Sequence, residues 1–124
     1  EPFYINTQSG KILEYPMSIT KILGLTFATC GGGYFRLLPF SITKALLHQS
    51  QYKMTYFHPR DFDYAQPRLS MSAIKYFKTY VGLLSSKSKF KKLLENFNPI
   101  SISEDLKTRD LDKLKIIELK SLGN

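Results

Sequence analysis

Thr55-Tyr56-Phe57-His58-Pro59-Arg60-Asp61-Phe62-Asp63 is the stretch from which the fold of this chain is best predicted. Its first residues favour a β-strand, and Pro59 cannot extend a central strand, so we expect the strand to end at His58. Polar residues that follow a buried strand are where α/β proteins place their chemistry. His58 is therefore the first candidate for a functional residue.

The composition indicates a single domain. The chain has 124 residues, of which 43% are hydrophobic, and this suffices for one modest core. It starts at Glu1 rather than at methionine, and we expect it to be a piece of a longer protein. We find no signal-peptide pattern and expect no transmembrane segment. Cys30 is the only cysteine, which excludes an internal disulfide and a cysteine-based zinc site.

The chain is basic, with 18 Lys and Arg residues against 10 Asp and Glu residues. Most of the excess follows residue 70, chiefly as Lys75, Lys78, Lys87, Lys89, Lys91 and Lys92. Such a balance favours an anionic partner, whether nucleic acid, lipid headgroups or acidic glycan. A solvated helix face explains the same lysines, and both interpretations stay open.

The first half of the chain is predicted to alternate strands and helices. Residues 1–11 are expected to be irregular, 12–15 to form a short strand, and the glycines at 31–33 to make a tight connection before a helix. Residues 39–49 are predicted as a helix, and residues 53–57 as the next strand. A strand, a helix and a strand in this order are typical of a βαβ unit with parallel pairing.

The second half is predicted to be mainly helical. Apolar residues at helical spacing mark one helix over 74–84 and another over 90–97, separated at Ser85 and Ser86 and stopped by Asn98 and Pro99. Residues 101–106 are expected to form a last short strand or a turn capped by Ser103. The pattern of residues 111–122 fits either a helix or a strand.

His58 suits acid or base catalysis because the charge of a histidine changes near neutral pH. The alternative is a histidine that is satisfied by a backbone carbonyl at a strand end. His48 is expected to be a surface or packing residue. Arg36 follows the glycines, where its guanidinium could clamp a carboxylate or orient a catalytic acid, or form an ordinary salt bridge.

His58, Asp61 and Asp63 could together hold a metal ion, but their spacing matches no established site. We expect instead that the two carboxylates cap a turn or pair with Arg60 and Arg68. The chain has no nucleophile-elbow motif and no defined RNA-binding motif.

Five segments lie in an order and at a spacing that a known family shares. They are Glu14-Tyr15-Pro16-Met17-Ser18, Gly31-Gly32-Gly33-Tyr34-Phe35-Arg36-Leu37-Leu38-Pro39, Tyr56-Phe57-His58-Pro59 with Asp61, Asp63 and Gln66-Pro67-Arg68, Tyr80-Val81-Gly82-Leu83, and Leu93-Leu94-Glu95-Asn96-Phe97. With them the chain resembles the carboxyl-terminal third of bacterial polysaccharide deacetylases, the NodB-homology carbohydrate esterases associated with exopolysaccharide biosynthesis. The expected domain covers residues 1–106, and 107–124 are a carboxyl-terminal extension of unknown type.

The resemblance implies an α/β fold made of the last βα units of a distorted (β/α) barrel plus carboxyl-terminal helices, an incomplete barrel. It implies a metal-dependent hydrolase, using zinc in the complete enzyme, that removes N-acetyl groups from a polysaccharide. In that family an aspartate activates a metal-bound water, and a histidine in a Leu-x-His motif protonates the leaving amine. His58 matches this histidine, and Tyr34, Arg36, Tyr56 and Arg60 are the implied substrate-binding residues.

Two departures from the family pattern limit what this chain is expected to do. The family usually has tryptophan where this chain has Arg60. The Thr-Phe-Asp-Asp and His-x-x-x-His segments that supply the base and the metal ligands are absent, so we expect no metal and no activity in this chain alone.

The expected partners are an N-acetylated polysaccharide, the remainder of the deacetylase barrel and, through an unpaired strand edge, a second copy of the chain. Nucleic acid is not expected. The alternative function is a non-enzymatic basic module that binds acidic glycan, a membrane surface or nucleic acid. A bacterial cytoplasmic location and a cell-envelope location both stay open.

Overall fold

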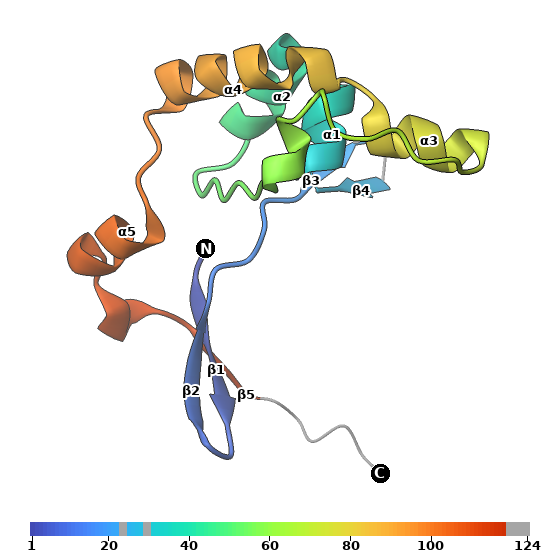
Figure 1. Cartoon of the computed structure of the whole chain (residues 1–124). Coiled ribbons are helices and arrows are strands. Elements are labelled where there is room, and N and C mark those ends of the chain that lie inside the picture. The colour runs from blue at the N-terminus through green and yellow to red at the C-terminus, as the bar shows by residue number, and fades with distance from the viewer. Residues whose placement is uncertain (23–24, 29–30, 119–124) are drawn as a thin grey trace. The chain divides into compact units, whose positions relative to one another are not determined.

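The structure is a computed structural model that describes residues 1–22, 25–28 and 31–118. Helices and strands both contribute, so the fold is mixed α/β (Figure 1). The chain divides into two compact units, Glu1–Pro16 with Pro99–Asn124, called unit 1 here, and Met17–Asn98, called unit 2. None of the helices within the described ranges has the length and apolar character that crossing a bilayer requires.

Unit 1 contains a three-stranded sheet in the order β2-β1-β5. β1 (Phe3–Thr7) pairs with β2 (Gly10–Glu14) as an antiparallel hairpin and with β5 (Ile116–Glu118) in parallel. The short strand predicted at 12–15 is confirmed as part of β2. The irregular start predicted for residues 1–11 is wrong, because β1 is paired on both edges and one of its partners lies near the other end of the chain.

The helix of unit 1 is α5 (Ile102–Thr108), which is followed by the 3-10 helix η2 (Leu111–Lys113). The Ser101 hydroxyl accepts the backbone N–H of Glu104 at 3.2 Å, and the Glu104 carboxylate accepts the N–H of Ser101 at 2.9 Å. This reciprocal capping makes Ser101 the N-cap of α5, so the strand or turn predicted for 101–106, with Ser103 as its cap, is wrong. The segment 111–122 was predicted as either a helix or a strand. It contains the short 3-10 helix η2 and then the strand β5, and residues 119–122 lie outside the described residues.

Unit 2 begins with the antiparallel pair β3 (Thr20–Ile22) and β4 (Leu25–Phe27) and continues as helices. They are α1 (Gly32–Leu37), α2 (Phe40–His48), the 3-10 helix η1 (Pro59–Asp61), α3 (Ala73–Tyr80) and α4 (Leu83–Phe97). The predicted helix at 39–49 is confirmed as α2. The tight connection predicted at 31–33 is wrong for two of the three glycines, because α1 begins at Gly32 and only Gly31 precedes the helix, as its N-cap.

Two further predictions for unit 2 need correction. Residues 53–57 do not form a strand; only Tyr56 pairs, in a single parallel bridge to Gly31. The break between the last two helices falls at Val81 and Gly82, not at Ser85 and Ser86. Gly82 adopts φ 68°, a left-handed conformation that favours glycine, and both serine hydroxyls donate to its carbonyl from inside α4.

The core of unit 2 is aromatic. Phe35, Leu47 and Leu93 are buried, and Phe40, Phe57, Phe90 and Phe97 pack against them. The ring of Phe57 contacts those of Phe35 and Phe90 edge to face, with centroids 4.8 and 5.3 Å apart. This packing fixes the chain just before His58 against α1 and α4.

Candidate functional site

His58 lies between the Tyr56 bridge and the 3-10 helix η1, with an extended backbone of φ −96° and ψ 150°. Its side chain is exposed, and its ring meets the ring of Tyr56 edge to face with centroids 4.8 Å apart. Pro59 follows and restricts the backbone, because its ring fixes φ. The structure thus presents an accessible imidazole on a locally constrained backbone.

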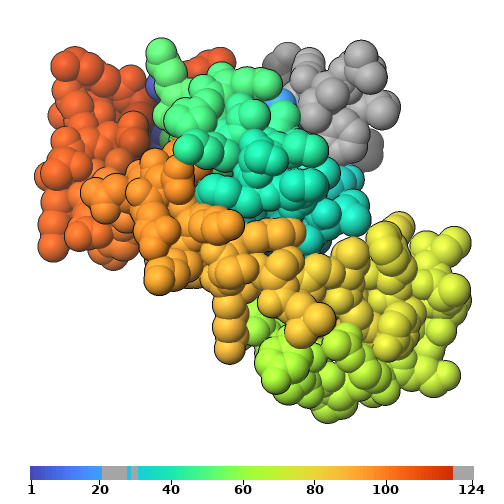
Figure 2. Space-filling view, turned by 90° about the horizontal axis from the view of Figure 1, so that it is seen from above, coloured from blue at the N-terminus to red at the C-terminus, as the bar shows by residue number. Residues whose placement is uncertain are grey.

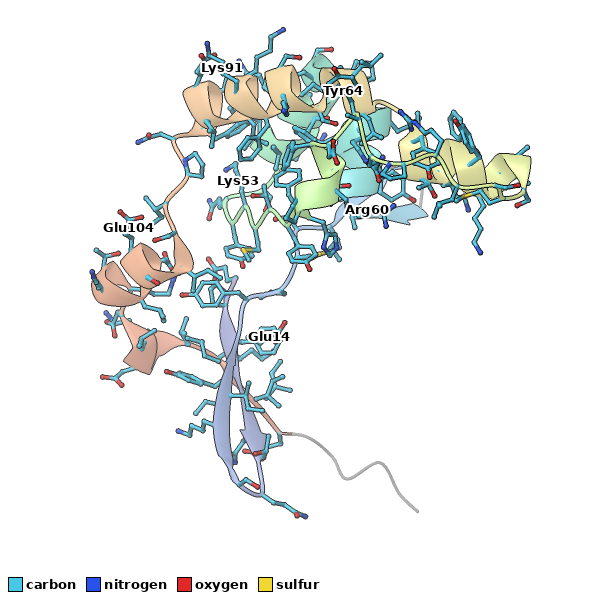
Figure 3. The ribbon with its side chains drawn as sticks, in the orientation of Figure 1. Glu14, Lys53, Arg60, Tyr64, Lys91 and Glu104 are labelled. Carbon is cyan, nitrogen blue, oxygen red and sulfur yellow. The ribbon has the colours of Figure 1, made fainter. Side chains whose placement is uncertain are left out.

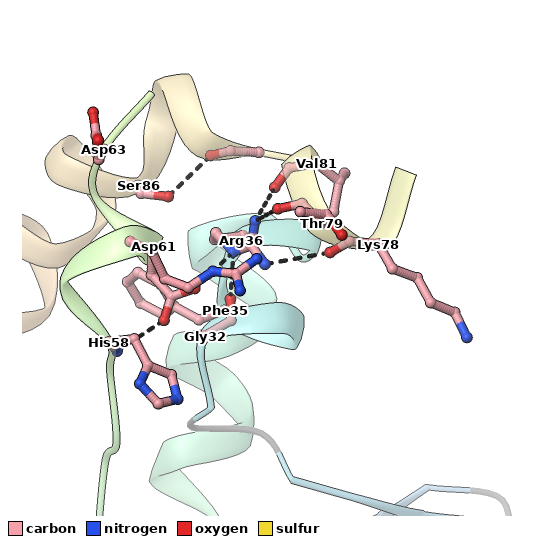
Figure 4. A network of polar contacts seen from close by, with 12 residues as sticks. Gly32, Phe35, Arg36, His58, Asp61, Asp63, Lys78, Thr79, Val81 and Ser86 are labelled. Carbon is pink, nitrogen blue, oxygen red and sulfur yellow. Dashed lines mark hydrogen bonds and ion pairs between the residues drawn. The ribbon is translucent and has the colours of Figure 1, made fainter. Parts of the chain in front are cut away.

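Asp61 fixes the backbone of His58 at both of its polar atoms. The N–H of His58 donates to Oδ2 of Asp61 at 2.9 Å, and the N–H of Asp61 donates to the carbonyl of His58 at 2.9 Å. The Asp61 residue is only 4% exposed. In the close-up, the His58 backbone faces Asp61 while its ring is directed away from that carboxylate (Figure 4).

The buried partner of Asp61 is Arg36, which is 5% exposed. Nε of Arg36 lies 3.2 Å from Oδ1 of Asp61. The guanidinium also donates to the carbonyls of Gly32, Lys78, Thr79 and Val81 at 2.7 to 3.3 Å. Arg36 therefore joins the start of α1 to the carboxyl end of α3 and to the loop of His58.

Burial lowers the pKa of Arg36, and the nearby charge of Arg60 acts in the same direction, whereas Asp61 raises it. An arginine remains charged under such conditions. The Arg36 cation is consequently buried and is held by the Asp61 carboxylate and by backbone carbonyls. One oxygen of Asp61 faces Arg36 and the other accepts the N–H of His58.

The close contact between α1 and Asp61 requires glycine at position 32. A Cβ atom at Gly32 would overlap the carboxylate of Asp61, whereas one at Gly31 or Gly33 would meet no atom within 4 Å. Absence of a side chain at Gly32 thus allows α1 to approach Asp61 closely enough for the Arg36 contact.

Lys89 makes a second, partly buried cationic contact beside the site. Its ammonium donates to the carbonyls of Phe35, Arg36 and Leu38 at 3.3, 2.7 and 2.9 Å. Burial lowers its pKa. The sequence prediction grouped Lys89 with the outward lysines; the structure directs it inward, where it satisfies the carboxyl end of α1.

Three of the residues expected to bind substrate, Tyr34, Tyr56 and Arg60, have exposed side chains. Because Gly31 pairs with Tyr56, the start of α1, which carries Tyr34, lies beside Tyr56. Arg60 borders a hollow of about 420 Å³ whose lining also includes Lys75 and Tyr80. Of the three residues, Tyr56 contacts His58 within the described part of the chain, through its ring.

Arg36 differs from those three because all its contacts lie inside unit 2. Of the roles left open for it, the structure provides the salt bridge, with Asp61 as the carboxylate. A direct substrate contact from Arg36 would require this network to open.

The metal cluster considered for His58, Asp61 and Asp63 does not form. Asp61 is engaged by Arg36 and His58, and Asp63 accepts the N–H of Ala65 at 3.1 Å, which confirms that it caps a turn. No group of three or more His, Cys, Asp and Glu side chains suited to a metal occurs in residues 1–22, 25–28 and 31–118. The described residues therefore do not fit a metal site.

Asp61 was expected to cap a turn or to pair with Arg60 or Arg68. It does cap the turn that starts η1, and what the sequence analysis missed is its ion pair with Arg36. Arg68 instead stacks over the ring of Tyr80, 4.3 Å from its centroid. A signal for Asp61 existed in the spacing His58-Pro59-Arg60-Asp61. A carboxylate three residues after a helix cap, with proline at the first helical position, is a pattern in which the side chain reaches back to the cap N–H.

The fold and the site together define a mixed α/β domain in which a buried arginine–aspartate pair holds the backbone of an exposed histidine. The chain belongs to the family described as "Domain of unknown function (DUF3473)", whose family model matches residues 1–107. Searches of curated proteins and of solved structures yield no match.

Proposed function

We propose that this chain is the carboxyl-terminal part of a metal-dependent polysaccharide deacetylase, in which it completes a (β/α) barrel with its last βα units. In this proposal it supplies His58 as the general acid, with Tyr34, Tyr56 and Arg60 in the substrate groove. The substrate class is a polysaccharide that carries N-acetylated sugars.

The observation that carries the proposal is the exposed imidazole of His58 on a backbone held at both polar atoms by Asp61. A general acid must reach the substrate and must also be held in a defined position. The family match over residues 1–107 covers the segments on which the resemblance to the deacetylases rests, so these segments belong to one family domain.

The chemistry assigned to this chain is one proton transfer. Hydrolysis adds water to the acetyl carbonyl and then breaks the C–N bond, releasing acetate and the sugar amine. Protonated His58 donates its ring proton to the departing nitrogen, becomes neutral and regains a proton from solvent. The resemblance implies zinc as the metal of the complete enzyme, and its ligands would come from outside this chain because the described residues do not fit one.

The test uses the complete protein and an N-acetylglucosamine oligomer, with acetate release as the readout. His58→Gln is expected to lower kcat by about a hundredfold or more while metal content stays unchanged. His48→Gln is the matched control, because His48 is also exposed but packs against Phe97, with ring centroids 5.0 Å apart. Normal kcat in His58→Gln would remove this residue from the mechanism.

One observation favours the alternative, a basic binding module. α3 buries none of its residues, and Ile74 and Phe77 are exposed beside Lys75 and Lys78. In the space-filling view, α3 and the segment before it form a continuous outer surface of unit 2 (yellow to yellow-green, Figure 2). Binding to an acidic glycan that weakens steeply with added salt, and that is lost in Lys75→Gln with Lys78→Gln, would support this function.

A further inference from the structure

Asp61 holds the backbone of His58, and through that backbone it determines where the ring of His58 can be. Its Oδ2 accepts the N–H of His58, and its own N–H donates to the carbonyl of His58. These two bonds, with Pro59 between the two residues, fix the direction of the Cα–Cβ bond of His58. Only the side-chain torsions of His58 then remain free.

The position of Asp61 is itself determined by two other elements. Arg36 holds the carboxylate from α1, and the same guanidinium is anchored on the carboxyl end of α3 through Lys78, Thr79 and Val81. A carboxylate that is almost completely buried is stable only while such partners stay in place. Gly32 brings α1 to the required distance, because any side chain there would displace Asp61.

We propose that Asp61 is a positioning residue for His58, and that Arg36 and Gly32 act by holding Asp61. The inference rests on the proposed role of His58 as proton donor. Catalytic groups act efficiently only when held to a fraction of an ångström, and a displacement of about 1 Å can cost about a hundredfold in rate. The buried network thus couples the end of α3 and the start of α1 to the placement of the acid.

The test compares two substrates in the complete protein. Amide hydrolysis of an N-acetylglucosamine oligomer needs a proton on the leaving amine, whereas 4-nitrophenyl acetate releases a phenolate that needs none. Asp61→Asn keeps the shape of the side chain but removes the charge opposite Arg36. We expect kcat for the amide to fall by about tenfold to a hundredfold with little change in KM, and activity on the ester to stay within about threefold of wild type.

The matched control is Asp63→Asn, which alters an exposed carboxylate two residues further on and is expected to leave both activities unchanged. In a His58→Gln background, Asp61→Asn should cause no further loss on the amide, because both changes remove the same function. Equal losses on amide and ester would indicate a structural role alone and would overturn the inference.

The failure of the inference differs from the failure of the proposed function. If His58→Gln loses amide hydrolysis and folded Asp61→Asn does not, only the positioning role is wrong. If His58→Gln retains full activity, or the complete protein releases no acetate, the proposed function fails and the inference fails with it. Should Asp61→Asn not fold, Arg36→Met with Asp61→Asn removes both charges together; if this variant also fails to fold, the pair is structural and the positioning role is rejected.

Discussion

Gly82 faces the backbone of Arg36 so closely that a Cβ atom on Gly82 would overlap the Arg36 carbonyl oxygen. Gly82 is also the N-cap of α4 and adopts φ 68°, in the left-handed region. Gly82 thus follows the C-cap of α3, precedes the first residue of α4 and allows the backbone of α1 to approach this junction closely. Both the space and the backbone conformation require glycine here.

Replacement of Gly82 by alanine should therefore be costly. We expect Gly82→Ala to lower the free energy of unfolding by about 2 to 4 kcal/mol, since it adds backbone strain and steric overlap. Urea unfolding followed by circular dichroism measures this change. Gly33→Ala is the matched control, because a Cβ at Gly33 in α1 meets no atom within 4 Å and alanine is the better helix former, so a neutral or stabilising effect is expected. Equal effects of the two substitutions would contradict the packing at Gly82.

Lys89→Met tests the partly buried ammonium at the carboxyl end of α1. Methionine retains much of the apolar stem but cannot donate to the carbonyls of Phe35, Arg36 and Leu38. We expect a loss of about 1 to 3 kcal/mol in the free energy of unfolding, because these carbonyls lose their donor. Lys91→Met, two residues along α4, replaces a side chain that is 79% exposed and points outward (Figure 3), and it should change stability by less than about 0.5 kcal/mol. A similar result for both lysines would argue against the inward position of Lys89.

Leu93 and Leu94 are neighbours in α4 with opposite environments, 2% and 42% exposed. Leu93→Ala removes a side chain from the cluster with Phe35 and Leu47, and we expect a loss of about 2 to 5 kcal/mol. Leu94→Ala should cost much less, since part of its side chain is already in water. Denaturant midpoints of the two variants give the comparison, and the reverse order would mean that α4 presents a different face to the core.

The stability of unit 1 should depend on pH through Asp105. Two hydrogen bonds from the Arg109 guanidinium, at 2.6 and 2.8 Å, lower the pKa of Asp105 against a smaller opposing effect of burial, and a hydrogen bond of 2.8 Å from the Tyr15 hydroxyl adds to the lowering. A carboxyl group whose pKa is lower in the folded state stabilises the fold above its unfolded-state pKa of about 4. That contribution is lost as the pH falls through the folded-state pKa.

Asp105→Asn should consequently lower the free energy of unfolding by about 1 to 2 kcal/mol at pH 7, and the difference from wild type should shrink below about pH 4. Urea unfolding over this pH range measures it. Asp110→Asn alters an exposed pair with Lys113 and should have an effect below about 1 kcal/mol with little pH dependence. A difference between Asp105→Asn and wild type that does not change with pH would show that the Arg109 contact is not formed.

The sequence by itself determined the elements whose signals are local. The apolar spacing after Pro39 specified α2, Asn98 and Pro99 ended α4, and the segments around the glycines and His58 led to the family resemblance. Each of these signals depends on propensity, periodicity or composition within a few residues.

The tertiary structure decided what depends on contacts between distant residues. β1 pairs along one edge with β5, which is more than a hundred residues away in the sequence. Arg36 can be buried because α3 ends where the carbonyls of Lys78 and Thr79 accept hydrogen bonds from the guanidinium. The inward turn of Lys89 likewise follows from the packing of α4 on α1. A residue's sequence neighbours do not reveal which charge will be buried, because burial and its compensating partners are properties of the packed chain.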